Sequence, residues 1–338
     1  MPEISLTGPN PLVYPHLTTW GWQIALYLFL GGLVAGLMVL SGAMRLLGRA
    51  GWERVQLVSD IAAAPLLAVG LLALVLDLSK PFNFWRLFTT FQPRSAISWG
   101  SWILLVSLLL LGLRFLTRLP VAPSAPAPVP VAVRKGRRLA GLWQRLKSSV
   151  VGATLAVWRL LQWLGSLAER YHRPLAVVTV GLGICVGFYT GVLLSTMSAR
   201  PLWNSAALAP LFLVSGLAAG SAFTCLFLPD HEHKQLAPLS LLLCGVELVL
   251  ILAYAISLSF GLAGAQQAAG LLFGGRYGLL FWGVVVLVGL LVPATLEALT
   301  VRGRSAPQML SRLPALLKLA GGVTLRFVIV AAGLLSAL

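Results

Sequence analysis

Residues 19–46, TWGWQIALYLFLGGLVAGLMVLSGAMRL, decide the fold, because they contain no charged side chain before Arg45. A helix of about 20 apolar residues is long enough to cross the hydrocarbon core of a bilayer. Further runs of this kind lie at 55–79, 98–117, 174–198, 206–228, 237–261, 277–300 and 315–337. The sequence therefore predicts an all-α integral membrane protein with eight transmembrane helices.

The composition excludes the common soluble classes. Apolar residues make up 58% of the 338 and charged residues only 10%, whereas a soluble domain carries about 25% charged residues. The net charge of +16 is therefore not evidence for a nucleic-acid partner, and we expect none. An ordinary soluble enzyme is excluded on the same ground.

The lysines and arginines predict the orientation, since these residues are retained on the cytoplasmic side. Twenty of the 25 fall at one set of helix ends and five at the other. This places both termini in the periplasm of a bacterium, with the protein in the inner membrane. Residues 1–20 contain no basic residue, so we expect no signal peptide. A ninth span at 149–168 would reverse every later loop, and we reject it because the charges would then lie on the wrong side.

Residues 119–173 form a predicted cytoplasmic insertion between the third and fourth spans. The insertion begins with the proline-alanine tract PVAPSAPAPVPVAV, which favours extended polyproline geometry, and continues as a basic amphipathic segment. Such a segment is typical of a helix in the lipid headgroup plane, and a helix that docks a partner is the alternative. The predicted organisation has an outer segment with three spans (1–118), this insertion, the fourth span (174–205) and a second four-helix bundle (206–338).

A short internal repeat links the first and fifth spans. Gly32-Leu33-Val34-Ala35-Gly36 is echoed by Gly216-Leu217-Ala218-Ala219-Gly220. Four spans separate the copies, so both run in the same direction. We therefore predict two four-helix bundles related as a parallel repeat, each with a small-xxx-small contact that brings backbones close together.

No metal or haem site is predicted in this protein. Cys185, Cys225 and Cys244 lie in apolar runs without CxxC spacing and are expected to be small buried residues. The four histidines lie in polar connecting segments, so none is placed to clamp a haem between two spans. His231 and His233 flank Glu232, but a solvated loop explains this triplet better than a metal site.

The outer connection between the second and third spans breaks the charge rule. Residues 76–102, LDLSKPFNFWRLFTTFQPRSAISWGSW, combine three cations with many aromatic side chains. An aromatic belt at the membrane interface explains the rings alone. The cations on the outer side need a further reason, and we predict that Lys80, Trp85, Arg86 and Arg94 belong to a loop that docks an acidic or cofactor-bearing partner.

Ionisable residues inside spans are the next signal, because each costs about 2.5–3.5 kcal/mol at a helix centre. Glu247 lies near the predicted bilayer midplane and Arg326 lies deep enough to meet it. A structural ion pair and a proton-relay element are both open for this pair. Asp77 is adjacent to Lys80, and a local ion pair or a functional role are open for it too. Asp60 and Glu297 lie near helix ends, where we expect them to reach water.

Polar groups in the outer half of the membrane complete the candidates. Gln23 and Tyr27 lie one turn apart on the first span, hence on one face. Tyr189 and Thr190 lie in the fourth span. A tyrosine hydroxyl beside an amide can donate hydrogen bonds to a carbonyl oxygen while the ring lines an apolar slot. Simple interfacial anchoring is the alternative, and it fits Tyr27 better than the deeper Tyr189.

Seven strings carry a resemblance to a known family. They are WGWQIALYLFLGGLVAGL (20–37), the 76–102 loop, GFYTGVLLSTMSARPLWN (187–204), PLFLVSGLAAGSA (210–222), GVELVLILA (245–253), FWGVVVLVGLLVP (281–293) and LRFVIVAAG (325–333). In this order they resemble the NrfD/polysulfide reductase (PsrC-like) membrane-subunit family. The resemblance covers nearly every span and leaves out the 119–173 insertion.

The resemblance implies a quinone-reactive subunit with eight helices and no haem or metal of its own. Members of this family dock a periplasmic-side [4Fe-4S] ferredoxin-like subunit, which is bound in turn to a molybdopterin enzyme or a multihaem cytochrome. Tyr189 matches the family tyrosine that hydrogen-bonds the quinone, while Tyr27 stands where the polysulfide reductase branch has a histidine. That departure makes Gln23 the nearest substitute for the second ligand. Glu247 and Arg326 also match family positions.

The predicted function is therefore electron exchange between a menaquinol or ubiquinol and an iron-sulfur subunit near the periplasmic face. The quinone is expected to contact Tyr189, Tyr27, Gln23 and Thr190, and protons to move by way of Glu247, Arg326 and Asp77. A passive membrane anchor and a secondary transporter are the alternatives. Broken spans with glycine or proline in matching halves are typical of a transporter, and Pro293 has no such counterpart.

Overall fold

The computed structural model describes residues 21–48, 51–78, 80–118, 159–160, 163–168, 170–197, 199–261, 263–302 and 311–336. Every regular element in these ranges is helical. Eight helices are long and apolar enough to cross a membrane, which confirms the predicted fold class. The proline-alanine tract and most of 149–168 lie outside the described residues, so the headgroup-plane helix and the rejected ninth span stay predictions.

Seven of the eight spans match the predicted runs to within three residues at each end, and the sixth begins seven residues earlier than predicted. The first four are α1 (Trp22–Leu47), α2 (Glu53–Asp77), α4 (Ala96–Arg118) and α6 (His172–Ser195). The last four are α7 (Leu208–Cys225), α8 (Asp230–Ser259), η3 (Leu279–Leu291) continuing as α10 (Val292–Val301), and α11 (Leu313–Leu335). Short elements lie in the connections: η1 (Pro81–Asn83), α3 (Arg86–Thr89), α9 (Ala263–Ala269) and η2 (Gly270–Gly274).

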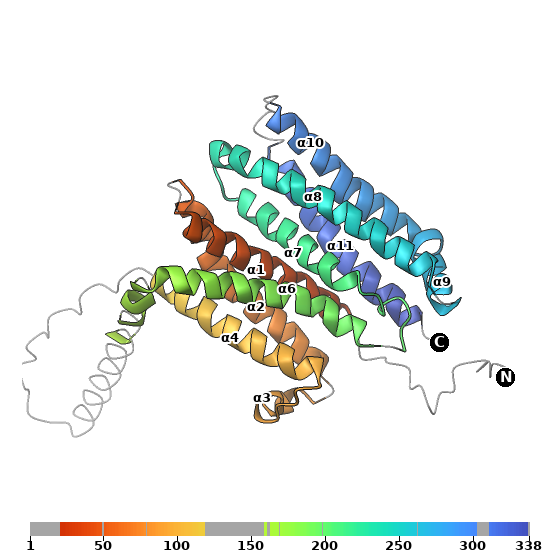
Figure 1. Cartoon of the computed structure of the whole chain (residues 1–338), viewed down its shortest axis with the longest axis horizontal. Helices are drawn as coiled ribbons and strands as arrows, with labels where there is room; N and C mark the ends of the chain where they lie inside the picture. The colour runs from red at the N-terminus through yellow and green to blue at the C-terminus, as the bar shows by residue number, and fades with distance from the viewer. Residues whose placement is uncertain are drawn as a thin grey trace, which may run out of the picture.

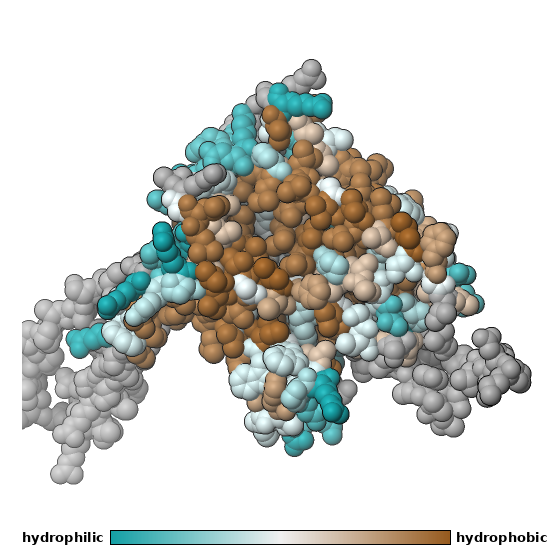
Figure 2. Space-filling model, in the orientation of Figure 1, coloured by the Kyte–Doolittle hydropathy of each residue, from teal (hydrophilic) through white to brown (hydrophobic). Residues whose placement is uncertain are grey.

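The two ends of the helix bundle differ in chemistry. We call the end where α1 and α4 finish the basic end, because Arg45, Arg114 and Arg118 lie there. The opposite end, where residues 78–95 join α2 to α4, is called the loop end, and α3 projects from it (Figure 1). Apolar side chains cover the middle of the visible face, and hydrophilic ones gather toward its edges and on the α3 loop (Figure 2). This apolar band is the surface expected of a protein whose middle lies in the hydrocarbon core of a bilayer.

Helix α1 is the most buried span and packs against α2, α6, α7 and α11. Gly32 and Gly36 of α1 face Gly216 and Gly220 of α7. A Cβ atom on Gly36 would lie 2.3 Å from the carbonyl oxygen of Gly216, so only glycine permits this approach. The two copies of the repeat contact each other across the two halves, while Gly289 and Gly321 form a further close contact within the second half.

This glycine junction joins the two halves of the protein. Because α1 packs against helices of both halves, the division into two four-helix bundles stays a prediction. The connection from α6 to α7 is also tied across the molecule. The Trp203 indole Nε1 donates to the carbonyl oxygen of Ile329 at 2.8 Å, and the Arg200 guanidinium donates to that of Leu334. Burial lowers the pKa of Arg200 from its ordinary value.

Candidate functional site

In the half of α1 nearer the loop end, two buried polar atoms lack a hydrogen-bond partner within the described part of the chain. They are the hydroxyl of Tyr27, whose side chain is fully buried, and Oε1 of Gln23, one turn closer to the loop end. Buried polar groups are hydrogen-bonded in the great majority of structures, and an exception needs a ligand or an ordered water to satisfy it. The Tyr27 hydroxyl can donate to an acceptor on a ligand, and the Gln23 oxygen can accept from a donor on a ligand. The two atoms therefore indicate a ligand site at this end of α1.

Tyr189 of α6 lies beside this place. Its phenol lies near that of Tyr27, and its side chain is buried. The ring lies directly over Gly100 of α4, where a Cβ atom would be 1.7 Å from the ring carbon Cζ. A larger residue at position 100 would therefore displace the ring. The structure thus brings α1, α4 and α6 together around the two phenols.

Thr190 follows Tyr189 in α6, but its hydroxyl already has a hydrogen-bond partner. Its hydroxyl donates to the carbonyl oxygen of Gly187 at 2.7 Å, within its own helix. Its methyl group faces Gly31 of α1, where a Cβ atom would be 3.5 Å away. Thr190 therefore packs α6 against α1 and directs its proton away from the tyrosines.

Asp77 ends α2 at the same end of the bundle as Gln23. Its Oδ1 accepts a long hydrogen bond from the backbone N–H of Gly21, at 3.4 Å. Among the described residues, no ion pair joins Asp77 to Lys80. Asp77 thus links the end of α2 to the start of α1, beside the orphaned amide of Gln23.

A second polar centre lies farther along α1. The guanidinium of Arg326 on α11 is fully buried, donates to Ser215 Oγ and donates to the carbonyl oxygen of Phe212 at 3.0 Å. It also stacks over the Phe212 ring, 4.6 Å from the ring centroid. Buried Glu247 interacts with both Ser215 and Arg326. The structure therefore brings Glu247 and Arg326 together around one serine.

Arg326 also reaches α1. A Cβ atom on Gly32 would lie 3.2 Å from its Nη2, so the guanidinium sits at the glycine junction. Gly32 and Tyr27 are five residues apart on the same helix, a rise of about 7.5 Å. The buried charge and the orphaned phenol are thus near neighbours along α1.

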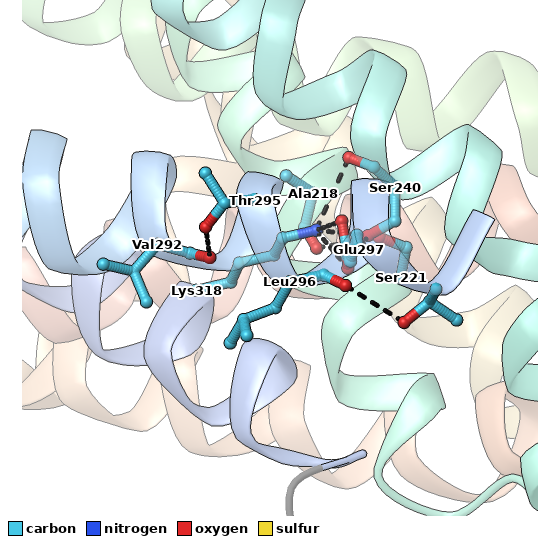
Figure 3. Close-up of polar contacts among 9 residues, drawn as sticks. Ala218, Ser221, Ser240, Val292, Thr295, Leu296, Glu297 and Lys318 are labelled. Carbon is cyan, nitrogen blue, oxygen red and sulfur yellow. Dashed lines mark hydrogen bonds and ion pairs between the residues drawn. The ribbon is translucent and has the colours of Figure 1, made fainter. Parts of the chain in front are cut away.

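A third polar centre is the ion pair of Glu297 and Lys318 near the basic end (Figure 3). Lys318 Nζ lies 2.7 Å from both carboxylate oxygens of Glu297, and Ser240 Oγ donates to Glu297 Oε1 at 2.8 Å. The side chains of Glu297 and Lys318 are only 4% and 3% exposed. The expectation that Glu297 reaches water is therefore wrong, because Lys318, which the charge pattern marks only as a topological signal, neutralises it inside the protein.

Helix α8 connects the second and third centres. His233, Ser240, Cys244 and Glu247 are buried and recur at spacings of 7, 4 and 3 residues, so they share one face. Cys244 lies near Glu297, Lys318 and Glu247. The expectation of a solvated loop at the His231-Glu232-His233 triplet is wrong, because the triplet lies in α8 and both Glu232 and His233 are buried. The sequence marked Glu247 as an ionisable residue and Cys244 as a buried one, but it did not point to the stripe. The signal that could have found it was the helical spacing of Ser240 and His233 with Glu247, on a face otherwise apolar.

Asp60 of α2 likewise differs from the sequence-based expectation. It is 2% exposed and pairs with Arg45, with Arg118 at 3.0 Å and with Arg114 at 3.6 Å. Near a helix end the sequence predicts contact with water, but the last turns of α1 and α4 bring three guanidinium groups over the carboxylate instead. The four side chains come from three helices, which no local pattern predicts.

The loop end presents an exposed aromatic and cationic surface. Lys80, Trp85, Arg86 and Arg94 are all exposed, and the Arg86 guanidinium lies 5.7 Å from the Trp85 ring centroid. The loop is ordered from within: the Trp99 indole donates to the carbonyl oxygen of Pro93 at 2.9 Å. A hollow of about 310 Å³ opens beside Arg86. All four predicted docking residues are therefore accessible at the loop end.

Metal-binding groups are absent from the described residues: no cluster of three or more histidine, cysteine or acidic side chains occurs there. Cys225 and Cys244 are buried and free, as expected. Cys185 is exposed on α6, which corrects the expectation that all three are buried. It lies within a span, so its exposed surface faces the apolar belt.

Comparison with known proteins identifies the family. Residues 12–337 match the family described as Polysulphide reductase, NrfD. The chain belongs to the NrfD family.

Relatives of this NrfD-family protein match along most of their length. Protein NrfD of Escherichia coli (strain K12) is 28% identical over 94% of this chain and 95% of its own. A component of the polysulfide reductase of Wolinella succinogenes is 29% identical over 94% and 95%. A component of the selenate reductase of Mesobacillus selenatarsenatis is 28% identical over 81% of this chain and 66% of its own. Two of these NrfD-family relatives are thus named as parts of reductases.

Proposed function

We propose that this protein is the membrane subunit of a respiratory oxidoreductase complex and exchanges electrons between a quinol or quinone and a docked iron-sulfur subunit. The orphaned buried hydroxyl of Tyr27, beside Tyr189 and the unpaired Oε1 of Gln23, carries the proposal. Membership of a family that includes parts of reductases supports it.

The polar atoms fit a quinone. A phenol O–H donates to a carbonyl oxygen, and an amide oxygen accepts from a hydroxyl, so Tyr27, Tyr189 and Gln23 offer both kinds of partner to a quinone head. The quinone supplies the two-electron chemistry when bound. The protein's own residues orient the head at the loop end, with Thr190 holding α6 against α1. The protein needs no haem or metal for this role.

The loop end is the proposed docking face. A ferredoxin-like subunit with [4Fe-4S] clusters would bind over Lys80, Trp85, Arg86 and Arg94, and a molybdopterin enzyme or multihaem cytochrome would bind beyond it. The exposed guanidinium of Arg86 lies beside the Trp85 ring. Such a pair can attract an acidic protein surface by its charge and contact it with the ring. The loop end then faces the periplasm, both termini lie there, and the basic end faces the cytoplasm.

Protons released or taken up at the quinone need a route, and buried ionisable groups supply candidate stations. Asp77 lies at the loop end near Gln23, while Glu247 and Arg326 lie deeper. The Glu297–Lys318 pair extends this series along α8 toward the basic end. We propose Asp77 for exchange with the near side and the Glu247–Arg326 centre for any exchange with the far side.

The test is quinol-dependent turnover of the purified complex carrying Tyr189→Phe. Turnover should fall about fivefold or more, since a neutral donor to a bound carbonyl contributes about 1 kcal/mol or more, while the complex assembles normally. Unchanged turnover with sensitivity to quinone-site inhibitors would contradict the site assignment. Assembly with iron-sulfur partners but without any quinone-inhibitor sensitivity would show a passive anchor instead.

A further inference from the structure

A cavity of about 480 Å³ opens at the basic end between α1, α2, α4 and α6. Its polar wall holds Arg45, Arg114 and Arg118 around the buried carboxylate of Asp60. It lies at the opposite end of the bundle from Tyr27 and Gln23, so the proposed quinone chemistry does not use it.

The described lining of the cavity is rich in positive charge. Within it, three guanidinium groups face the one carboxylate of Asp60. With Glu53, exposed at the rim, the arginines of the described lining outnumber its carboxylates by one. Removing cations from water without full compensation is costly. A bound anion would supply the missing compensation.

The arginines are held so that donors remain available. Arg114 Nη2 donates to Thr179 Oγ1 at 2.8 Å, and Arg118 Nε donates to Asp60 Oδ2 at 3.0 Å. The buried Nε of Arg45 has no hydrogen-bond partner within the described residues. Arg118 contacts Asp60 through its Nε and keeps 35% of its side chain exposed. Fixed guanidinium forks of this kind match the oxygens of a phosphate.

The surroundings of the cavity suit a lipid headgroup. Leu110, Leu113 and Leu175 form an apolar wall beside the arginines. Val177 and Val178 of α6 are exposed in the apolar belt one turn away. The cavity therefore lies where spans end, at the depth at which phospholipid phosphates are found.

We propose that this cavity binds a phosphate group, supplied either by an anionic phospholipid or by free phosphate. Asp60 holds the three arginines in position, and Arg45 and Arg118 donate to the phosphate oxygens. Binding at this point would fix α4 and α6 against α1 and α2, and would stabilise the first half of the protein.

The experiment measures the thermal unfolding temperature of the full-length protein, purified in neutral detergent and stripped of lipid. The probes are phosphatidylglycerol, a diacylglycerol with the same acyl chains, and inorganic phosphate. Phosphatidylglycerol should raise the unfolding temperature in a saturable manner and diacylglycerol should not. Protection by inorganic phosphate alone would identify free phosphate as a sufficient source. Equal effects of the two lipids together with no effect of phosphate would overturn the proposal.

Two variants locate the effect. Arg118→Gln should weaken the apparent affinity for phosphatidylglycerol about tenfold, because it removes a charge-assisted donor. Arg54→Gln is the matched control: Arg54 is 61% exposed at the same end, pairs with Glu232 at 3.8 Å and does not line the cavity. An undiminished lipid response in Arg118→Gln would refute the site. If that variant does not fold, native mass spectrometry of the wild type decides: absence of any retained anionic phospholipid or phosphate would refute it equally.

Discussion

Lys318 and Glu297 form a two-pronged ion pair inside the membrane-spanning region, with Nζ 2.7 Å from each carboxylate oxygen. Ser240 donates to the same carboxylate at 2.8 Å. The contacts come from α11, α10 and α8, so the pair ties together three helices of the second half of the protein. Because the ion pair is enclosed in the protein, substitution of either partner should change the stability of the protein.

Removing one partner of this pair should be more harmful than removing both. Glu297→Gln leaves the Lys318 ammonium buried without its counter-ion and is expected to cost about 3–5 kcal/mol. The double variant Glu297→Gln, Lys318→Met should cost less than either single change. A double-mutant cycle of unfolding in detergent measures the coupling. Additive effects of the two changes would contradict the enclosed pair.

Tyr27→Phe should separate stability from function. The Tyr27 hydroxyl is buried without a partner among the described residues, so its removal is expected to stabilise the quinone-free protein by about 1 kcal/mol. Quinol-dependent turnover should nevertheless fall about tenfold. Both quantities can be measured on one preparation, by thermal unfolding and by quinol oxidation.

The control for that change is Tyr254→Phe. The Tyr254 hydroxyl donates to the carbonyl oxygen of Leu202 at 2.7 Å, so its loss should lower stability by about 1 kcal/mol and spare the affinity for quinol. If Tyr27→Phe destabilises the protein as Tyr254→Phe does, then Tyr27 is a structural residue and not a ligand.

Gly36→Ala should disrupt the glycine junction. The added methyl group would lie 2.3 Å from the carbonyl oxygen of Gly216, so α1 and α7 must move apart, at a cost of about 1–3 kcal/mol. Gly112→Ala on α4 is the control, because nothing lies within 4 Å of its Cβ position and alanine favours the helix. In thermal unfolding, Gly36→Ala should therefore unfold at a lower temperature than Gly112→Ala. Equal unfolding temperatures of the two variants would contradict the close approach of α1 and α7.

Arg86→Glu should weaken the proposed docking of the iron-sulfur subunit. Arg86 is exposed beside Trp85, so a reversed charge repels an acidic partner, and the effect should diminish at high ionic strength. Arg276→Glu makes the same charge change on another exposed connection at the loop end. Co-purification of the partner at low and high salt compares the two variants. Equal losses for both would indicate a general charge effect rather than a docking face.

Some contacts of the candidate site lie within one helix and could be predicted from the sequence, whereas others join different helices and could not. Tyr27 and Gln23 are one turn apart, so the helical period alone places them on one face. The approach of Tyr189 depends on Gly100 of another helix, and the joining of Glu247 with Arg326 depends on Ser215 of a third. The sequence pointed to these residues singly. It could not predict that Thr190 directs its hydroxyl to Gly187 within its own helix.

The sequence by itself determined the number of spans, the limits of seven of them to within three residues, and the family. Hydrophobic length and the order of motifs are local properties of the chain. The tertiary structure decided which charges are neutralised. Asp60 and Glu297 look alike in sequence, both near helix ends, yet packing surrounds the first with three arginines and gives the second one lysine. It also decided that the two glycine motifs meet each other. Contacts between distant helices depend on rotation and depth in the bundle, and hydrophobicity along one helix does not fix either.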